Sequence, residues 1–229
     1  MTMPQTASYV DAIGHVPPGG TLIVTNVPWS EYEQLLSTLG EGYTARITYD
    51  RGRLEIMAPS SSHEMYKELL VGIGRLVAQE MGVDLESRGS TTFKVERFAQ
   101  GAEPDTCFYV QHATSIIGKT MIDLETDPPP DVIVEVDVSH ASINKLDFYA
   151  SLGVPEVWRY DERRMCIYHL TAQGYVEALA SRTFPPLTGN ALTEFLERSK
   201  SAGQSAALRS VRDWLRQAMA QGSTQTDDR

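Results

Sequence analysis

The chain has 229 residues, of which 41% are hydrophobic and 22% charged, and its formal net charge is −10. This composition is ordinary for a soluble globular protein. Nucleic-acid binders usually show a basic footprint, so the acidity of the whole chain disfavours a tight binder with a uniformly basic surface. No apolar run is long enough to span a bilayer, and the N-terminus lacks the basic and apolar regions of a signal peptide. We therefore expect a cytoplasmic protein with no membrane partner.

The two cysteines, Cys107 and Cys166, both lie in apolar, strand-like segments. Two cysteines make no disulfide framework, and their separation does not match the spacing of zinc ligands. We expect two buried thiols in a reducing compartment.

The first half of the chain alternates helical and strand-like segments. Residues 29–36 predict a helix, with Ser30 as N-cap and Glu33 three residues later, the pattern of a capping box. Apolar runs on both sides of the glycine turn at residues 50–53 predict a β-hairpin. Apolar positions at helical spacing predict a long helix over residues 63–81. The other expected elements are a short helix at 7–13 and strands at 83–86, 91–95 and 103–110, the first two joined by a turn at 87–90.

The first turn of the long helix would contain His63 and Glu64. An acid at this position is stabilised by the helix dipole, which is a sufficient structural explanation for Glu64. The functional alternative is that Glu64 leans over the acidic strands described below. His63 could cap the helix or contact a phosphate, but a lone histidine at a helix start is usually a surface residue, and we expect this of His63.

The second half of the chain centres on a β-branched run at residues 130–137, which predicts a buried strand. It follows a polar connection at residues 112–129 and precedes a helix at residues 143–152. The other expected elements are strands at 155–160, 165–170 and 175–178, helices at 194–196 and 206–219, and a disordered tail at 222–229.

Two carboxylates end the central strand. Side chains alternate between the faces of a strand, so Glu135 and Asp137 should point the same way. Two acids there repel each other and are costly to desolvate, so a cation should compensate them. Lys145, at the start of the next helix, could do so, and so could a metal ion. With Asp105 on the strand before, this pattern is typical of a metal-dependent phosphodiesterase site.

Four segments in this order carry a resemblance to a known family. They are Glu103-Pro104-Asp105, Pro129-Pro130-Asp131-Val132-Ile133-Val134-Glu135-Val136-Asp137, Lys145 to Tyr149, and Gly153-Val154-Pro155-Glu156-Val157-Trp158-Arg159-Tyr160-Asp161. Together they resemble the Uma family of putative restriction endonucleases, a branch of the PD-(D/E)xK nuclease superfamily. The resemblance runs from about residue 32 to residue 170 and includes the segment at 54–59 and the helix start at 62–64.

The resemblance implies roles for individual residues. Asp105 matches the motif aspartate and Glu135 the motif acid, and together they would bind Mg²⁺, with Mn²⁺ as a substitute. The standard pattern has a lysine two residues after the acid, where this chain has Asp137. Lys145 would then be the displaced lysine, and Asp137 would add a ligand or pair with it. Glu64 would match the acid that some superfamily members carry on the first core helix.

The same resemblance implies the fold, an α/β (α+β) restriction-endonuclease-like mixed β-sheet core flanked by helices, with an N-terminal β-hairpin. We expect an N-terminal extension at residues 1–28, the nuclease-like domain at 29–200, and a C-terminal helix and disordered tail at 201–229. The implied activity is magnesium-dependent hydrolysis of DNA phosphodiester bonds. The alternative is a catalytically inactive binding or assembly module of the same fold, which the net acidity favours.

The acidic cluster also has a structural alternative, an ion-pair network at the sheet edge. We prefer the metal site because three acids are expected to converge with one lysine. A homodimer is expected as well, because Trp158 is predicted on a sheet edge that invites pairing, and restriction-type enzymes that cut both strands commonly pair. The competing interpretation places Trp158 in the core.

Overall fold

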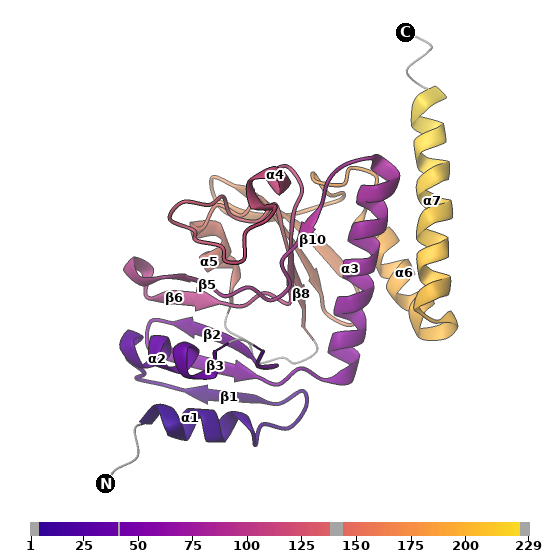
Figure 1. Cartoon of the computed structure of the whole chain (residues 1–229). Helices are drawn as coiled ribbons and strands as arrows, with labels where there is room; N and C mark the ends of the chain where they lie inside the picture. The colour runs from indigo at the N-terminus through magenta and orange to yellow at the C-terminus, as the bar shows by residue number, and fades with distance from the viewer. Residues whose placement is uncertain (1–4, 41, 138–143, 225–229) are drawn as a thin grey trace.

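The computed structural model describes residues 5–40, 42–137 and 144–224. Two β-sheets lie side by side, with a layer of long helices along one flank (Figure 1). None of the helices in this part of the chain has both the length and the apolar character needed to cross a membrane.

The first sheet is antiparallel and has the strand order β1-β3-β2-β6-β5. Its centre is the predicted hairpin, in which Arg51 and Gly52 have positive φ angles of 45° and 91°, as a tight hairpin turn requires. Tyr32 and Tyr49 stack at 4.7 Å in the core beneath it. The elements of this half are α1 (Gln5–Ile13), β1 (Thr21–Val24), α2 (Trp29–Leu39), β2 (Arg46–Asp50), β3 (Arg53–Met57), β5 (Phe93–Val95), η1 (Glu96–Phe98) and β6 (Gln100–Ala102).

Two local predictions for this half are wrong. The N-cap of α2 is Pro28, without a side-chain cap, so Ser30 and Glu33 form no capping box. The expected hairpin at residues 83–95 does not form either. Its first strand, β4 (Glu86–Ser87), pairs with β7 (Thr106–Tyr109) in the second sheet, and its second strand pairs with β6. Strand β6 was missed because it lacks an apolar alternation. A Cβ at its Gly101 would collide with the Tyr32 hydroxyl.

The second sheet confirms the mixed core, with the order β11-β10-β9-β8-β7-β4. Strands β7 and β8 pair antiparallel, with Thr106 opposite Val134, whereas β8 and β9 are parallel. The strand that Asp105 directly precedes and the strand that carries Glu135 are therefore neighbours near the middle of the sheet, as predicted. The strands are β7 (Thr106–Tyr109), β8 (Val132–Val136), β9 (Glu156–Tyr160), β10 (Met165–Thr171) and β11 (Gly174–Ala178), with α4 (Ala113–Ile116) between β7 and β8.

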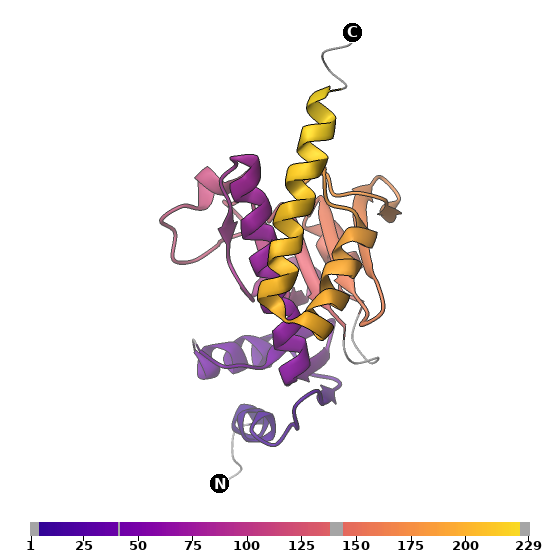
Figure 2. The same cartoon turned by 90° about the vertical axis from the view of Figure 1, so that its right-hand side faces the viewer.

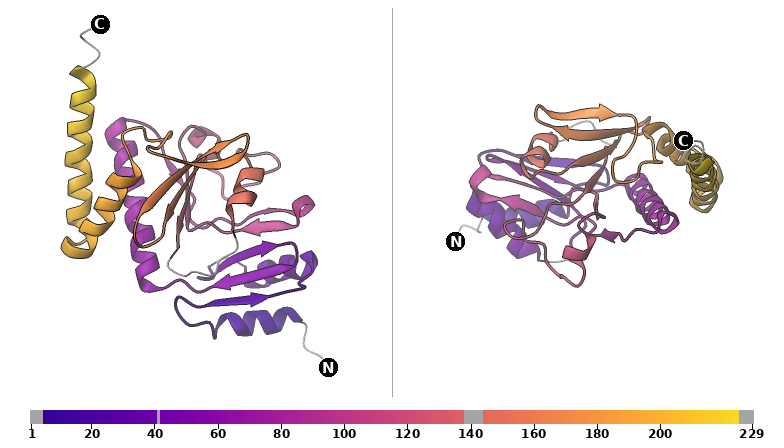
Figure 3. Two further views of the ribbon diagram at one scale, coloured as in Figure 1. Left: turned by 180° about the vertical axis from the view of Figure 1, so that it is seen from behind. Right: turned by 90° about the horizontal axis from the view of Figure 1, so that it is seen from above.

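Alternation along β8 sorts its side chains between two cores. Val134 faces α3 (Ser61–Met81) in the larger core, whereas Ile133 faces α5 (Leu146–Ser151) and the β5–β6 end of the first sheet. Glu135 therefore lies on the α5 side. Helix α7 (Gln204–Thr224) packs outside α3 and α6 (Gly189–Ala202), away from the sheet (Figures 2 and 3). The disordered tail expected at residues 222–229 is wrong for its first three residues, because α7 continues to Thr224, and residues 225–229 lie outside the described residues.

The sheet-edge position predicted for Trp158 is wrong. Strand β9 lies between β8 and β10, and Trp158 is fully buried against Phe108 and Phe184. The apolar residues around Trp158 in the sequence suit a core strand as well as an edge strand. Only the strand pairing shows that β9 is an inner strand of the sheet. Trp158 therefore gives no support to a dimer.

Helix α3 approaches the sheet closely at Gly74. A Cβ at this position would lie 2.9 Å from Cζ of Phe108, whereas one at Gly72 would lie 3.5 Å from Cδ2 of Leu208. Gly74→Ala should therefore lower the melting temperature, because overpacking by about 1–3 kcal/mol outweighs the roughly 1 kcal/mol gain in helix propensity. Gly72→Ala, the matched control, should raise it. Thermal unfolding of both variants checks this, and equal shifts would contradict it.

Candidate active site

Asp105 directly precedes β7 and is 2% exposed. Its Oδ2 accepts a hydrogen bond from the backbone N–H of Val136 at 2.7 Å, which ties it to β8. Its Oδ1 lies 3.0 Å from Nε2 of His63 and 3.7 Å from Nε of Arg46, without the alignment of a hydrogen bond. Burial alone would raise the pKa of Asp105, but His63 and the charge of Lys145 outweigh it and hold the pKa below its usual value.

Glu135 projects from β8 into the same site. Its Oε2 and Oε1 accept hydrogen bonds from Nζ of Lys145 at 2.9 and 3.2 Å, and Oε1 accepts another from the Tyr149 hydroxyl at 2.5 Å. Burial raises the pKa of Glu135 to about 7, and the neighbouring Asp105 adds to this, although Lys145 opposes it. Glu135 is thus a carboxyl group whose charge depends on the cations beside it.

Lys145 stands at the N-terminal boundary of α5, and the structure brings it back to Glu135 as predicted. Its Nζ also donates to the backbone carbonyl of Glu103 at 3.2 Å. Burial would lower the pKa of Lys145, but the charges of Glu135 and Asp105 more than compensate and raise it. The lysine therefore stays charged between the two acids. The helix was predicted to start at residue 143, which lies outside the described residues.

The other two candidate acids lie differently. Asp137 lines the same cleft, but its Oδ2 pairs with Nε of Arg159 at 2.5 Å. The side chain of Glu64 is 40% exposed and pairs with Lys67 and, at 3.4 Å, with Arg46. Within the described ranges, no three or more His, Cys, Asp or Glu side chains are grouped to hold a metal ion. Asp105, Glu135 and Asp137 nevertheless line one cleft with Lys145, as expected of the acidic cluster, and Asp105 and Glu135 stay the proposed pair of metal ligands.

A cleft of about 30 Å³ lies between the two sheets. It is lined by Asp105 and Glu135 beside the second sheet, by Lys145 at the start of α5, and by Thr48 and Glu55 from the first sheet. This volume holds roughly one or two water-sized groups. The pair of carboxylates fits a divalent cation, because Mg²⁺ prefers oxygen ligands and is often held by one or two carboxylates. The buried Oδ1 of Asp105, which has no aligned hydrogen-bond donor among the described residues, is consistent with such a ligand.

Three residues of the site were not predicted from the sequence. His63 was expected at the surface but is buried, and it contacts Asp105. Arg46 comes from the hairpin of the first sheet, and no local pattern in the sequence relates it to Asp105. Tyr149 could have been found, because it lies four residues after Lys145 and so shares a helix face with it.

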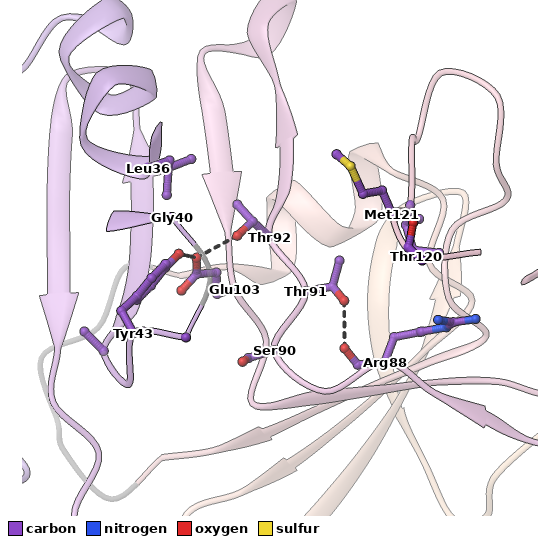
Figure 4. Close-up of a pocket in the computed structure, with 13 residues that line it drawn as sticks. Leu36, Gly40, Tyr43, Arg88, Ser90, Thr91, Thr92, Glu103, Thr120 and Met121 are labelled. Atoms are coloured by element: carbon purple, nitrogen blue, oxygen red, sulfur yellow. Dashed lines mark hydrogen bonds between the residues drawn. The ribbon is translucent and has the colours of Figure 1, made fainter. Parts of the chain in front are cut away.

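A larger cavity, of about 440 Å³, lies beside the first sheet (Figure 4). Tyr43, Thr92 and Glu103 lie together on one side of it and Arg88 on the other. The Glu103 carboxylate accepts hydrogen bonds from the Tyr43 and Thr92 hydroxyls, the latter at 2.7 Å. Burial raises the pKa of Glu103. None of the predicted site residues lines this cavity, so we place the candidate active site in the smaller cleft.

Comparisons with known proteins agree with the fold and the motifs. The Uma2 family, described as "Putative restriction endonuclease", matches residues 29–199. No curated protein matches the chain. Among solved structures, a putative nuclease belonging to DUF820 from Anabaena variabilis ATCC 29413 is similar in fold, with a TM-score of 0.53 at 16% identity, over 76% of this chain and 99% of that one. Since the family match spans well over half of the chain and includes Asp105, Glu135 and Lys145, the protein belongs to the Uma2 family of putative restriction endonucleases.

Proposed function

We propose that this protein is a magnesium-dependent endonuclease that hydrolyses phosphodiester bonds in DNA. The observation that carries the proposal is the pair of buried acids, Asp105 and Glu135, which neighbouring strands bring to one cleft beside the ammonium group of Lys145. The family match and the nuclease-like fold support the same reaction class. In this reaction a water oxygen bonds to phosphorus, one P–O ester bond breaks, and the departing oxygen takes a proton.

Asp105 and Glu135 would hold Mg²⁺, or Mn²⁺ in its place. The bound cation would lower the pKa of a water molecule and stabilise charge on the phosphoryl oxygens. The chain's own groups prepare the site. The Val136 amide fixes Asp105, and Tyr149 and Lys145 orient Glu135. Lys145 would place a positive charge beside the phosphate and orient the attacking water.

The second candidate function is a catalytically inactive binding or assembly module, which the net charge of −10 favours. Incubating the protein with supercoiled plasmid and with single-stranded DNA, in Mg²⁺, Mn²⁺ or EDTA, separates the two. An endonuclease should cut in either metal and not in EDTA. A protein that neither cuts nor gains thermal stability from either metal is the binding module.

Proton and metal binding at Glu135 should compete. The native carboxyl keeps its proton up to a pH of about 7, whereas the unfolded chain releases it near 4.5. The native state thus binds more protons in this window, so without metal the contribution of Glu135 to the free energy of unfolding should fall as the pH rises through it. A metal ion must displace that proton, so stabilisation by Mg²⁺ should be larger above this window than within it.

Denaturant unfolding across this pH range, with and without Mg²⁺, measures both effects. Glu135→Gln should remove its contribution to the slope and the metal response together, whereas Glu177→Gln, at an exposed ion pair outside the cleft, should keep both. A wild-type metal response that does not change with pH would contradict the competition.

We also propose a homodimer, since cutting both strands of a duplex commonly uses paired sites. This proposal rests on the proposed activity and no longer on Trp158. Light scattering at micromolar protein checks it, and the mass of a single chain would overturn it.

A further inference from the structure

A cavity of about 290 Å³ opens beside the catalytic cleft and shares Glu135, Asp137 and Lys145 with it. Asn144 and Arg159 also line it. This volume lies near the lower end for ligand pockets, so the cavity suits one nucleotide-sized unit rather than a duplex. Whatever enters it lies directly next to the two acids and the lysine of the cleft.

Arg159 reaches this cavity from β9. In the parallel register of β8 and β9, Arg159 is the partner of Glu135, so the two side chains leave the same face of the sheet. The Nε of Arg159 donates to Asp137 at 2.5 Å. Within the described part of the chain, neither Nη group makes a hydrogen bond, and the side chain is 45% exposed. The planar guanidinium is therefore held at one corner while its other donors stay available.

A contribution to folding stability is a poor explanation for the ion pair between Arg159 and Asp137. Half-exposed pairs contribute little to folding because water screens them and the long side chains lose entropy. An arginine whose Nη donors face a polar cavity is, in contrast, well suited to a phosphate group, since the fork of N–H donors matches two phosphate oxygens. In a chain with a net charge of −10, Arg159 and Lys145 also offset the two acids of this cavity, Glu135 and Asp137, with two cationic groups.

We propose that this cavity is a subsite for a backbone phosphate of the bound DNA strand, next to the scissile phosphate, and that Arg159 binds that phosphate. The inference rests on the proposed function, because the strand in the subsite is the one that the neighbouring acids would cut. Arg159 would thus add affinity for the DNA strand, which the net negative charge of the chain otherwise disfavours.

Fluorescence anisotropy with labelled duplex and single-stranded oligonucleotides tests this, over a series of salt concentrations, in Ca²⁺ and in EDTA. Arg159→Ala should weaken binding by about tenfold, and it should make the slope of log K against log salt shallower by roughly 0.9 for duplex or roughly 0.7 for single strands. Arg159→Lys should recover most of the slope. The control is Arg164→Ala, which removes the same charge from an exposed pair with Glu177 outside the cavity.

The outcomes separate this inference from the proposed activity. If Arg159→Ala matches Arg164→Ala in affinity and salt slope while the wild type cuts DNA, the subsite is wrong and the nuclease stands. If the wild type binds DNA with the Arg159 effect but never cuts, the subsite stands and the activity is wrong. A wild type that binds neither oligonucleotide in either buffer, or an Arg159→Ala variant that loses only thermal stability, overturns the subsite.

Discussion

Glu135→Gln is expected to stay folded and to lose magnesium-dependent DNA cleavage by about a thousandfold or more. The amide keeps the size of the side chain and can still accept from Lys145 and Tyr149, which now bind the carboxylate. It cannot supply the negative charge that holds a divalent cation. Asp105→Asn should behave alike, because its amide oxygen can still accept from Val136.

Cleavage rates of plasmid and single-stranded DNA, together with melting temperatures with and without Mg²⁺, measure this. Wild type should gain stability from the metal, by about 2.7 kcal/mol at a hundred times the dissociation constant, and Glu135→Gln should gain none. If the acids form only a structural network, the substitution would instead relieve repulsion and raise the melting temperature, and the metal would stabilise neither protein.

Lys145→Ala should reduce cleavage by about a hundredfold, the usual effect of removing one group that stabilises charge in a transition state. It should also destabilise the metal-free protein by about 3 kcal/mol, because the buried carboxylate of Glu135 would lose its only ion-pair partner among the described residues. Metal binding should survive, since neither proposed ligand is removed. Stabilisation by Mg²⁺ should therefore be larger in Lys145→Ala than in wild type.

Thermal unfolding over a magnesium titration distinguishes this from a role of Lys145 as a simple scaffold. A scaffold residue would lower the stability with and without metal by equal amounts. Lys200→Ala is a suitable control, because the ammonium group of Lys200 also pairs with a glutamate, Glu197, and neither residue lines the cleft. A variant of Lys145 that cuts at the wild-type rate would remove the lysine from the mechanism.

The sequence was most informative where one segment determined its own structure. The β-branched run at Val132–Val136 forms a strand in the core, and the turn with Gly52 forms the hairpin. The side-chain period of two placed Glu135 and Asp137 on one face, but it could not show that Arg159 would take Asp137 as its partner. The proximity of Lys145 to Glu135 followed from the acidic pattern together with the family resemblance.

Features that depend on distant partners could not be predicted. Strand β6 exists because β2 and β5 flank it, and its own residues Gln100–Ala102 show no strand pattern. Trp158 could be assigned to an inner strand only once β10 was known to pair with the free edge of β9. His63 is buried and lies 3.0 Å from Asp105, a residue far from it in the sequence, which its position in the helix cannot reveal.

The walls of the cleft come from both sheets, with Thr48 and Glu55 facing Asp105 and Glu135. A cation held by Asp105 and Glu135 would lie next to the residues of the first sheet that line the same cleft. Amide hydrogens in the β2–β3 hairpin should then exchange more slowly in the presence of Mg²⁺, although that hairpin supplies none of the proposed ligands. Metal binding at the site would thereby make the N-terminal part of the protein more rigid without changing its shape.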